Sequence, residues 1–268
     1  MRAKRILITG AAGRIGSLAR VALVPGRQVV RLFDRDPVAQ PGPLEETVIG
    51  DIADIDALAA ACAGMDCLVH LAGIPTEAPW DDLLPANVIG AYNGFEAARC
   101  AGVRRVVYAS SNHAVGFHST DHDLDCNSLT RPDSLYGAAK VWGEALASLY
   151  ADRHGLETCA LRIGSFRERP LSQRELKTWI SHRDMGQLLR CCVDAPAFHH
   201  FVAYGISANS DAQWSNGDLD AWLGYVAQDN AADWADNMQE PLAESSASSS
   251  HHGGPYCEPG FSGNPRLK

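Results

Sequence analysis

The sequence lacks an apolar run of about 18 residues, the length that a membrane-spanning helix requires. Its first residues lead directly into an apolar strand pattern, without the hydrophobic stretch and small-residue cleavage site of a secretory signal. Positive charge is also scarce, because 23 Lys and Arg stand against 32 Asp and Glu and the net charge is -9. These absences argue against a membrane or a nucleic acid as partner, and we expect a cytoplasmic protein.

Paired cysteines are absent as well. The eight cysteines form no C-x-x-C pair, and most of them fall in apolar helix or strand patterns. We therefore interpret them as reduced, buried thiols and predict no metal site. With 268 residues, of which 46% are hydrophobic, the chain is long enough for one large domain or for one domain with a small annex.

The sequence does contain a regular alternation of strand-like and helix-like segments. Strands are predicted at residues 4–9, 28–33, 47–49, 67–71, 104–109, 158–162 and 200–205. Helices are predicted from the first glycine-rich turn to about Val24, and at residues 54–63, 81–100, 133–154 and 182–194. This alternation predicts an α/β fold with a doubly wound, Rossmann-type parallel sheet, whose ligands bind at the carboxyl ends of the strands.

A glycine-rich turn joins the first predicted strand to the first predicted helix. It contains Gly10, Gly13 and Gly16, with Arg14 and Ile15 between the last two. The glycines permit a tight turn and a close approach of the backbone to a pyrophosphate, and the helix N-terminus supplies free N–H groups. This context of strand, turn and helix predicts that the turn binds a dinucleotide.

Acidic and small residues after the next strands extend this interpretation. Asp34 ends the second strand, where a carboxylate can accept both ribose hydroxyls of an adenosine and would repel a 2′-phosphate, so NAD is favoured over NADP. Arg35 beside it leaves tolerance of NADP open. Asp51 and Ile52 fit an adenine contact. The cofactor is expected to cross the sheet at three small or apolar residues, Leu71, Ala72 and Gly73.

Tyr136 and Lys140 lie one helical turn apart, so their side chains point the same way. We expect the opposite, apolar face of this helix to be its buried face, and Tyr136 and Lys140 to face the cleft; the apolar face holds Val141, Trp142, Ala145, Leu146 and Leu149. A tyrosine is a poor base at neutral pH unless a nearby ammonium favours its ionised form. Ser111 follows the fifth strand and could fix a reacting oxygen beside Tyr136.

Together these motifs resemble the extended short-chain dehydrogenase/reductase family, also described as NAD-dependent epimerases and dehydratases. The resemblance covers about the first 165 residues and rests on four segments: the glycine turn, residues 87–93, residues 106–111, and Tyr136 with Lys140. It implies NAD as cofactor and catalytic roles for Ser111, Tyr136 and Lys140. It also implies that Asn87 lies near the nicotinamide and that Lys140 binds the nicotinamide ribose.

Later segments resemble a narrower group of this family, whose members oxidise C1 of a hexuronate to an aldarolactone with NAD. The matching segments are residues 110–113, 162–165, 178–184, 205–209, 223–225 and 229–231. For this chain, the resemblance implies D-glucuronate or D-galacturonate as the small-molecule substrate. It further implies that Asn112, His113 and Ser165 bind sugar hydroxyls. The chain departs from the group where a serine is usual after Ile74, because it has Pro75 followed by Thr76.

A hexuronate also requires a cationic grip on its carboxylate. Arg174 is our candidate, in a polar segment at residues 171–177 that we expect to arch over the site as a loop. The main alternative is a sugar-nucleotide epimerase or dehydratase that retains NAD, although the short chain after Ser165 suits a free monosaccharide better. A cofactor-sensing binding protein is a second alternative, but such proteins often lack the Tyr or the Lys.

We expect the chain to have three regions. Residues 1–165 form the NAD-binding Rossmann domain, and residues 166–240 form a small substrate-binding part interleaved with the last sheet elements. Residues 241–268 begin with a Ser- and His-rich, low-complexity stretch and end in an irregular C-terminal arm. This arm could serve assembly, and we expect a homo-oligomer.

Overall fold

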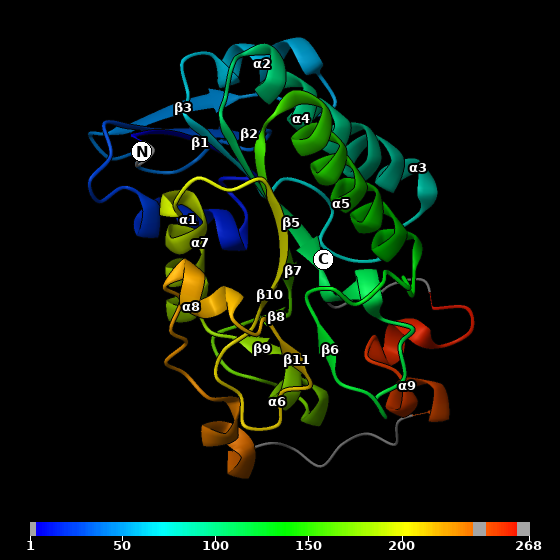
Figure 1. Cartoon of the computed structure of the whole chain (residues 1–268). Helices are drawn as coiled ribbons and strands as arrows, with labels where there is room; N and C mark the ends of the chain where they lie inside the picture. Colours follow the sequence, from blue (N-terminus) through cyan, green and yellow to red (C-terminus); the bar gives the residue numbers. More distant parts are fainter. Residues whose placement is uncertain (1–3, 238–244, 262–268) are drawn as a thin grey trace.

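The computed structural model describes residues 4–237 and 245–261, and its centre is a parallel sheet (Figure 1). The seven strands follow the order β10-β7-β5-β4-β1-β2-β3, and each neighbouring pair is parallel. Their bounds are β1 (Arg5–Thr9), β2 (Val29–Asp34), β3 (Glu45–Ile49), β4 (Cys67–His70), β5 (Arg105–Ser111), β7 (Glu157–Ile163) and β10 (His200–Gly205). The predicted doubly wound α/β fold is confirmed, with strand ends shifted by one or two residues.

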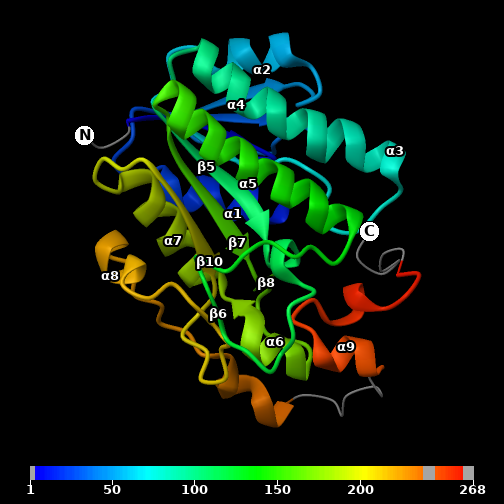
Figure 2. The same cartoon turned by 45° about the vertical axis from the view of Figure 1, so that its right-hand side comes forward.

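Helices cover both faces of this sheet. On one face lie α1 (Arg14–Leu23) and α7 (His182–Asp194); on the other lie α2 (Ile55–Cys62), α4 (Gly90–Cys100) and α5 (Leu135–His154), as Figure 2 shows. In β1, Ile6 and Ile8 join the core on the α1 side, whereas Leu7 joins the core on the α4 side. Because both faces are covered, the strand reads as a continuous apolar run.

The strand order reverses at β1. The chain runs outward from β1 through β2 to β3, and then returns to build β4, β5, β7 and β10 on the other side. The carboxyl ends of β1 and β4 therefore flank a crevice of the kind in which doubly wound sheets bind their ligands. The glycine turn and residues 71–73 follow β1 and β4, Asp34 and Ser111 end β2 and β5, and Tyr136 and Lys140 lie on α5.

The helix predicted at residues 81–100 is divided. It consists of α3 (Trp80–Leu83), a π-helical segment η1 (Leu84–Ile89) and α4. Pro85 stands in the π-helical segment, where it has no N–H for the regular helical hydrogen bond. A prediction from apolar spacing alone does not register this change of helix type.

The predicted burial of α5 is right for Leu146 but wrong for Trp142, Ala145 and Leu149, which are exposed. Tyr136, Lys140 and Glu144 are buried. The helix packs so closely on β5 that a Cβ at Gly143 would collide with the Tyr108 ring. This face is therefore made of small residues and of polar residues that find partners, and apolar character does not identify it.

Short elements gather at the carboxyl end of the sheet (Figure 1). They comprise β6 (Leu124–Asp125) paired with β11 (Trp214–Ser215), β8 (Ser165–Phe166) paired with β9 (Trp179–Ile180), α6 (Gln173–Thr178), α9 (Ser246–Ser250), and the 3-10 helices η2 (Asn112–Val115), η3 (Ala231–Asn237) and η4 (Gly254–Cys257). The short helix α8 (Leu219–Leu223) lies instead beside β10, where Trp222 meets Phe198 and Phe201. The segment predicted as a loop at residues 171–177 is largely α6, capped by Ser172, which accepts a hydrogen bond from Glu175 N–H. Two-residue strands are too short to leave a periodic signal in the sequence.

Residues 245–261, which include the Ser- and His-rich stretch and are called the C-terminal arm from this point on, pack against residues 116–122. His251 forms an antiparallel bridge with Ser119, and the Gly253 N–H donates to Gly116 O at 2.8 Å. The proposed division of the chain stays a prediction, and its boundary at residues 240 and 241 lies outside the described residues. Among residues 4–237 and 245–261, no helix combines the length and apolar character needed to cross a bilayer.

Candidate active site

The glycine turn has the geometry of a phosphate-binding turn. Gly10 has φ +70°, and a Cβ at Gly16 would collide with Gly10 O, so neither position accepts a side chain without strain. No side chain caps the N-terminus of α1, which leaves its first N–H groups directed at the crevice. The Arg14 guanidinium donates from Nη2 to Phe166 O at 2.8 Å and so joins the turn to β8.

The predicted adenosine contacts lie beside this turn. Asp34 accepts a hydrogen bond from Ala12 N–H at 2.9 Å through Oδ2, which fixes its carboxylate at the end of β2. Asp51 is exposed and accepts from Ala53 N–H, while Ile52 is buried against Gly90. The sequence reasoning did not identify Asn93, whose amide donates to Ile52 O at 2.8 Å and holds this segment in place.

The segment after β4 has a constrained backbone. Gly73 has φ +146°, and Ala72 N–H donates to Thr9 Oγ1 at 3.3 Å. Asn87 is buried, and its amide both accepts from Ile74 N–H at 2.7 Å and donates to Ile74 O at 2.9 Å. In the described residues, the Asn87 side chain therefore orders the segment that crosses the crevice.

Ser111, Tyr136 and Lys140 come together at the carboxyl end of β5. A side-chain hydrogen bond with Ser111 lowers the pKa of the Tyr136 phenol. Lys140 donates from Nζ to Ala109 O at 2.8 Å, and this nitrogen lies 5.6 Å from the centre of the Tyr136 ring. The helix and the strand thus present a phenol, a hydroxyl and an amine to one place.

Burial acts on the two titrating groups in opposite directions. It raises the pKa of the Tyr136 phenol above its ordinary value, and the Ser111 hydrogen bond lowers this pKa in part. Burial lowers the pKa of Lys140 to about 8. A base and an amine with perturbed pKa values at a strand end are typical of a catalytic site.

The predicted substrate residues surround this group. His113 stacks on Tyr256 with ring centres 3.7 Å apart and meets Tyr136 edge-on at 5.9 Å. With its amide oriented to satisfy both partners, Asn112 donates to Ile163 O at 3.1 Å and accepts from Arg174 Nη2 at 2.8 Å. These contacts place Arg174 beside Asn112 and connect it to the end of β7.

The C-terminal arm completes this side of the site. Arg174 donates from Nε and Nη2 to His252 O, at 3.1 and 2.9 Å. The hydroxyls of Thr76 and Tyr256 lie 2.7 Å apart, so Thr76 binds the arm. Ser165 is partly buried, with its Oγ 2.9 Å from Thr178 Oγ1.

Comparisons with known proteins identify the family of this chain. A model of the NAD dependent epimerase/dehydratase family matches residues 6–167. Uronate dehydrogenase from Pseudomonas putida is 41% identical over 228 residues, which are 85% of this chain and 85% of that protein. Uronate dehydrogenase from Agrobacterium fabrum is 42% identical over 228 residues, 85% of this chain and 86% of that protein.

The solved structures include a mutant uronate dehydrogenase from Agrobacterium tumefaciens complexed with NAD. It is 40% identical, has a TM-score of 0.90, and the match covers 96% of this chain and 98% of that chain. This chain belongs to the NAD-dependent epimerase/dehydratase family. The resemblance predicted from the four sequence segments is thereby confirmed.

Several residues of this chain lie at the site, although no pattern in the sequence identified them as site residues. They are Asp133, His252 and Tyr256, whereas Thr178, which also lies there, begins a segment that carries the family resemblance. Asp133 immediately precedes Ser134, the N-cap of α5, which hints only at a helix start. His252 falls in the stretch interpreted as low complexity, and Tyr256 falls in the tail expected to form an irregular arm.

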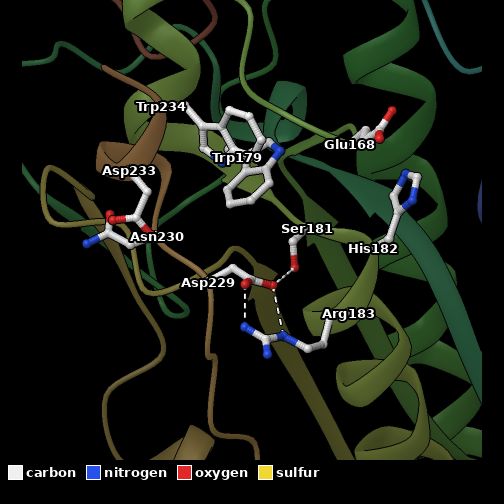
Figure 3. A pocket seen from close by; sticks show the side chains of 9 residues that line it. All are labelled: Glu168, Trp179, Ser181, His182, Arg183, Asp229, Asn230, Asp233 and Trp234. Atoms are coloured by element: carbon white, nitrogen blue, oxygen red, sulfur yellow. Dashed lines mark hydrogen bonds and ion pairs between the residues drawn. The ribbon is translucent and has the colours of Figure 1, made fainter. Parts of the chain in front are cut away.

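A separate pocket opens between β9 and η3 (Figure 3). Its lining includes Trp179, Trp234 and His182, and Asp229 there binds both Ser181 and Arg183. None of the predicted catalytic or substrate residues of this family member lines it. The polar side chain most deeply buried in its wall, Ser181, is already paired with Asp229.

Proposed function

We propose that this chain is an NAD-dependent uronate dehydrogenase, which oxidises C1 of a hexuronate, D-glucuronate or D-galacturonate, to an aldarolactone. One observation carries the proposal: a guanidinium, that of Arg174, shares a wall with Asn112 and His113 next to the Ser111 and Tyr136 hydroxyls. A carboxylate on Arg174 would leave the far end of a sugar ring at the phenol. The similarity to uronate dehydrogenases over most of the chain supports this assignment.

The residues of the crevice fit NAD. The uncapped N-terminus of α1 would receive the pyrophosphate, Asp34 the adenosine ribose, and Asp51 with Ile52 the adenine. Gly10, Gly13, Arg14, Ile15 and Gly16 form the turn, Leu71, Ala72 and Gly73 the floor, and Asn87 and Lys140 the nicotinamide end. Bound NAD would supply the acceptor for the hydride from C1.

The chain's own residues supply the proton chemistry and the orientation. Tyr136 takes the proton of the C1 hydroxyl, and Ser111 holds the same oxygen by a hydrogen bond. Lys140 gives the phenol a neighbouring positive charge when it is protonated. Asn112, His113 and Ser165 bind sugar hydroxyls, so the ring is held with C1 at Tyr136.

A spectrophotometric panel tests the activity. We expect purified protein with NAD to increase the NADH absorbance with D-glucuronate or D-galacturonate. With glucose, glucose 6-phosphate or UDP-glucose the rate should be lower by about 100-fold or more, because these compounds place no carboxylate on Arg174. Conversion of the sugar nucleotide without accumulation of NADH would favour the epimerase alternative instead.

Replacing Arg174 tests the carboxylate grip. Among the described residues no acceptor binds Arg174 Nη1, so this nitrogen remains for the substrate. We expect Arg174→Ala to lower kcat/KM for D-glucuronate by about 100-fold, the loss of a charge-assisted pair, while KM for NAD stays within about twofold. Arg99→Ala, which removes a surface guanidinium paired with Glu96, is the matched control. An unchanged kcat/KM in Arg174→Ala would remove this residue from the site.

The proposal includes a cytoplasmic location and a homo-oligomer, as the sequence predicts. The eight free cysteines are consistent with a reducing environment such as the cytoplasm. Analytical ultracentrifugation of the full chain would measure the oligomeric state.

A further inference from the structure

We propose that Asp133 is a positioning residue that fixes the tautomer of His113, so that His113 Nε2 accepts a hydrogen bond from a sugar hydroxyl. This inference rests on the proposed function, because it assigns a role within the same substrate site. Neither residue type nor spacing in the sequence singled out Asp133.

The contact itself is short and enclosed. Asp133 Oδ2 lies 2.7 Å from His113 Nδ1, and the Asp133 side chain is 0% exposed. Its other oxygen, Oδ1, accepts a hydrogen bond from Ser134 Oγ at 2.8 Å. A buried carboxylate accepts hydrogen bonds, so the proton of a neutral His113 is held on Nδ1.

Three glycines from separate segments make room for this carboxylate. A Cβ at Gly116 or at Gly253 would collide with Asp133 Oδ2, and a Cβ at Gly137 would lie 3.2 Å from Oδ1. These glycines follow η2, belong to the C-terminal arm and lie in α5, respectively. The surrounding chain is thus shaped to the Asp133 side chain, and a longer acid would not fit.

The remaining ring nitrogen of His113 is available to a ligand. No described residue forms a hydrogen bond with Nε2. This nitrogen is also not one of the fully buried polar atoms that lack a partner, so part of its surface is accessible. Tyr256 covers one face of the ring, and Tyr136 meets it edge-on. Because the side chain is 11% exposed and Nδ1 is taken, Nε2 is the polar atom left to face the substrate.

The charges around His113 determine what it can bind. Burial lowers the pKa of His113 and the Arg174 charge lowers it further, whereas Asp133 and Glu77 raise it; the net effect favours the neutral ring. A neutral ring with its proton on Nδ1 has only a lone pair at Nε2. It accepts from a hydroxyl and cannot donate to a carboxylate, which therefore falls to Arg174. Burial lowers the pKa of Arg174, and Asp133 offsets part of this lowering and so favours the charged guanidinium.

The test is Asp133→Asn, which keeps the shape and removes the charge. An Asn amide can donate to Nδ1 as well as accept from it, so both His113 tautomers become possible. We expect KM for D-glucuronate to rise about tenfold while KM for NAD and the melting temperature change little. Asp152→Asn is the matched control, because Asp152 makes a 2.7 Å contact with His199 at the exposed surface.

Long-range proton–nitrogen NMR on protein labelled with ¹⁵N-histidine reads the tautomer directly, with His113→Asn to assign the signal. We expect the wild-type signal to show an unprotonated Nε2, and Asp133→Asn to show a mixture. A wild-type proton on Nε2 overturns the proposal, even if the variant does not fold. An unchanged KM in a folded Asp133→Asn protein overturns it too. If the wild-type chain oxidises no uronate, the proposed function fails, which is a separate result.

Discussion

Replacing Tyr136 by Phe should lower kcat for D-glucuronate by about a thousandfold, because the ring remains and the proton acceptor is lost. KM for NAD and for the uronate should stay within about threefold, since Asn112, His113 and Arg174 are untouched. The folded state should survive, because the Tyr136 side chain packs by its ring against His113. Steady-state rates of NADH formation at saturating NAD measure the effect.

Tyr150→Phe is the control for this experiment. Tyr150 stands near the other end of the same helix, and its hydroxyl donates to Glu96 Oε2 at 2.8 Å. Its loss removes one tyrosine hydroxyl from α5 without changing the chemistry, so kcat should remain near the wild-type value. Near-wild-type turnover by Tyr136→Phe would rule out the proposed proton acceptor.

The sheet could be predicted because its strands carry their own signal. Strands buried on both faces, such as β1, read as short apolar runs, and β10 and α7 have the predicted bounds. Asp54 predicts the start of α2, and in the structure its side chain caps this helix by accepting a hydrogen bond from Asp56 N–H. Local sequence suffices where the determinant of an element is local.

The burial of α5 could not be predicted in this way. Its inward face includes Glu144, which is stabilised by two hydrogen bonds from Arg162 on β7 at 3.0 and 2.9 Å and one from Ser110 at 2.6 Å. A buried carboxylate is tolerated only with such partners, and these come from distant parts of the chain. Apolar periodicity contains no information about them.

The candidate site likewise contains residues that local sequence motifs identify and residues that only contacts between distant parts of the chain bring there. Gly10 and Ser111 lie at strand ends, Tyr136 and Lys140 form a compact motif on α5, and the structure brings the last three together. The C-terminal arm could not be assigned, because its contacts with Arg174 and His113 join residues far apart in sequence. The consequence of having Pro75 in place of the usual serine could not be predicted either, because the neighbouring Thr76 contacts Tyr256, which is far away in the sequence.

Lys140→Met should shift the pH dependence of kcat/KM to more alkaline values. Lys140 and Tyr136 are close enough to titrate as a pair, and with the pKa of Lys140 at about 8 the pair loses its first proton near that pH. After the pair loses one proton it exists either as neutral Lys140 beside a neutral phenol or as the Lys140 ammonium beside an ionised phenol. Only the second form is active, and its population rises with pH through this step. In the variant only Tyr136 titrates, and burial raises its pKa above the ordinary value.

At neutral pH, kcat of Lys140→Met should therefore fall by about 100-fold, and raising the pH should restore part of it. KM for NAD should also rise, because Lys140 is proposed to bind the nicotinamide ribose. Rates measured for the wild type and the variant across a pH series would give the pH at which kcat/KM rises in each protein. If kcat/KM of Lys140→Met rises over the same pH range as in the wild type, the charge of Lys140 does not act on the phenol, and the proposed coupling of Lys140 with Tyr136 is contradicted. The hydrogen bond from Nζ to Ala109 O would in that case make Lys140 a structural tie between α5 and β5.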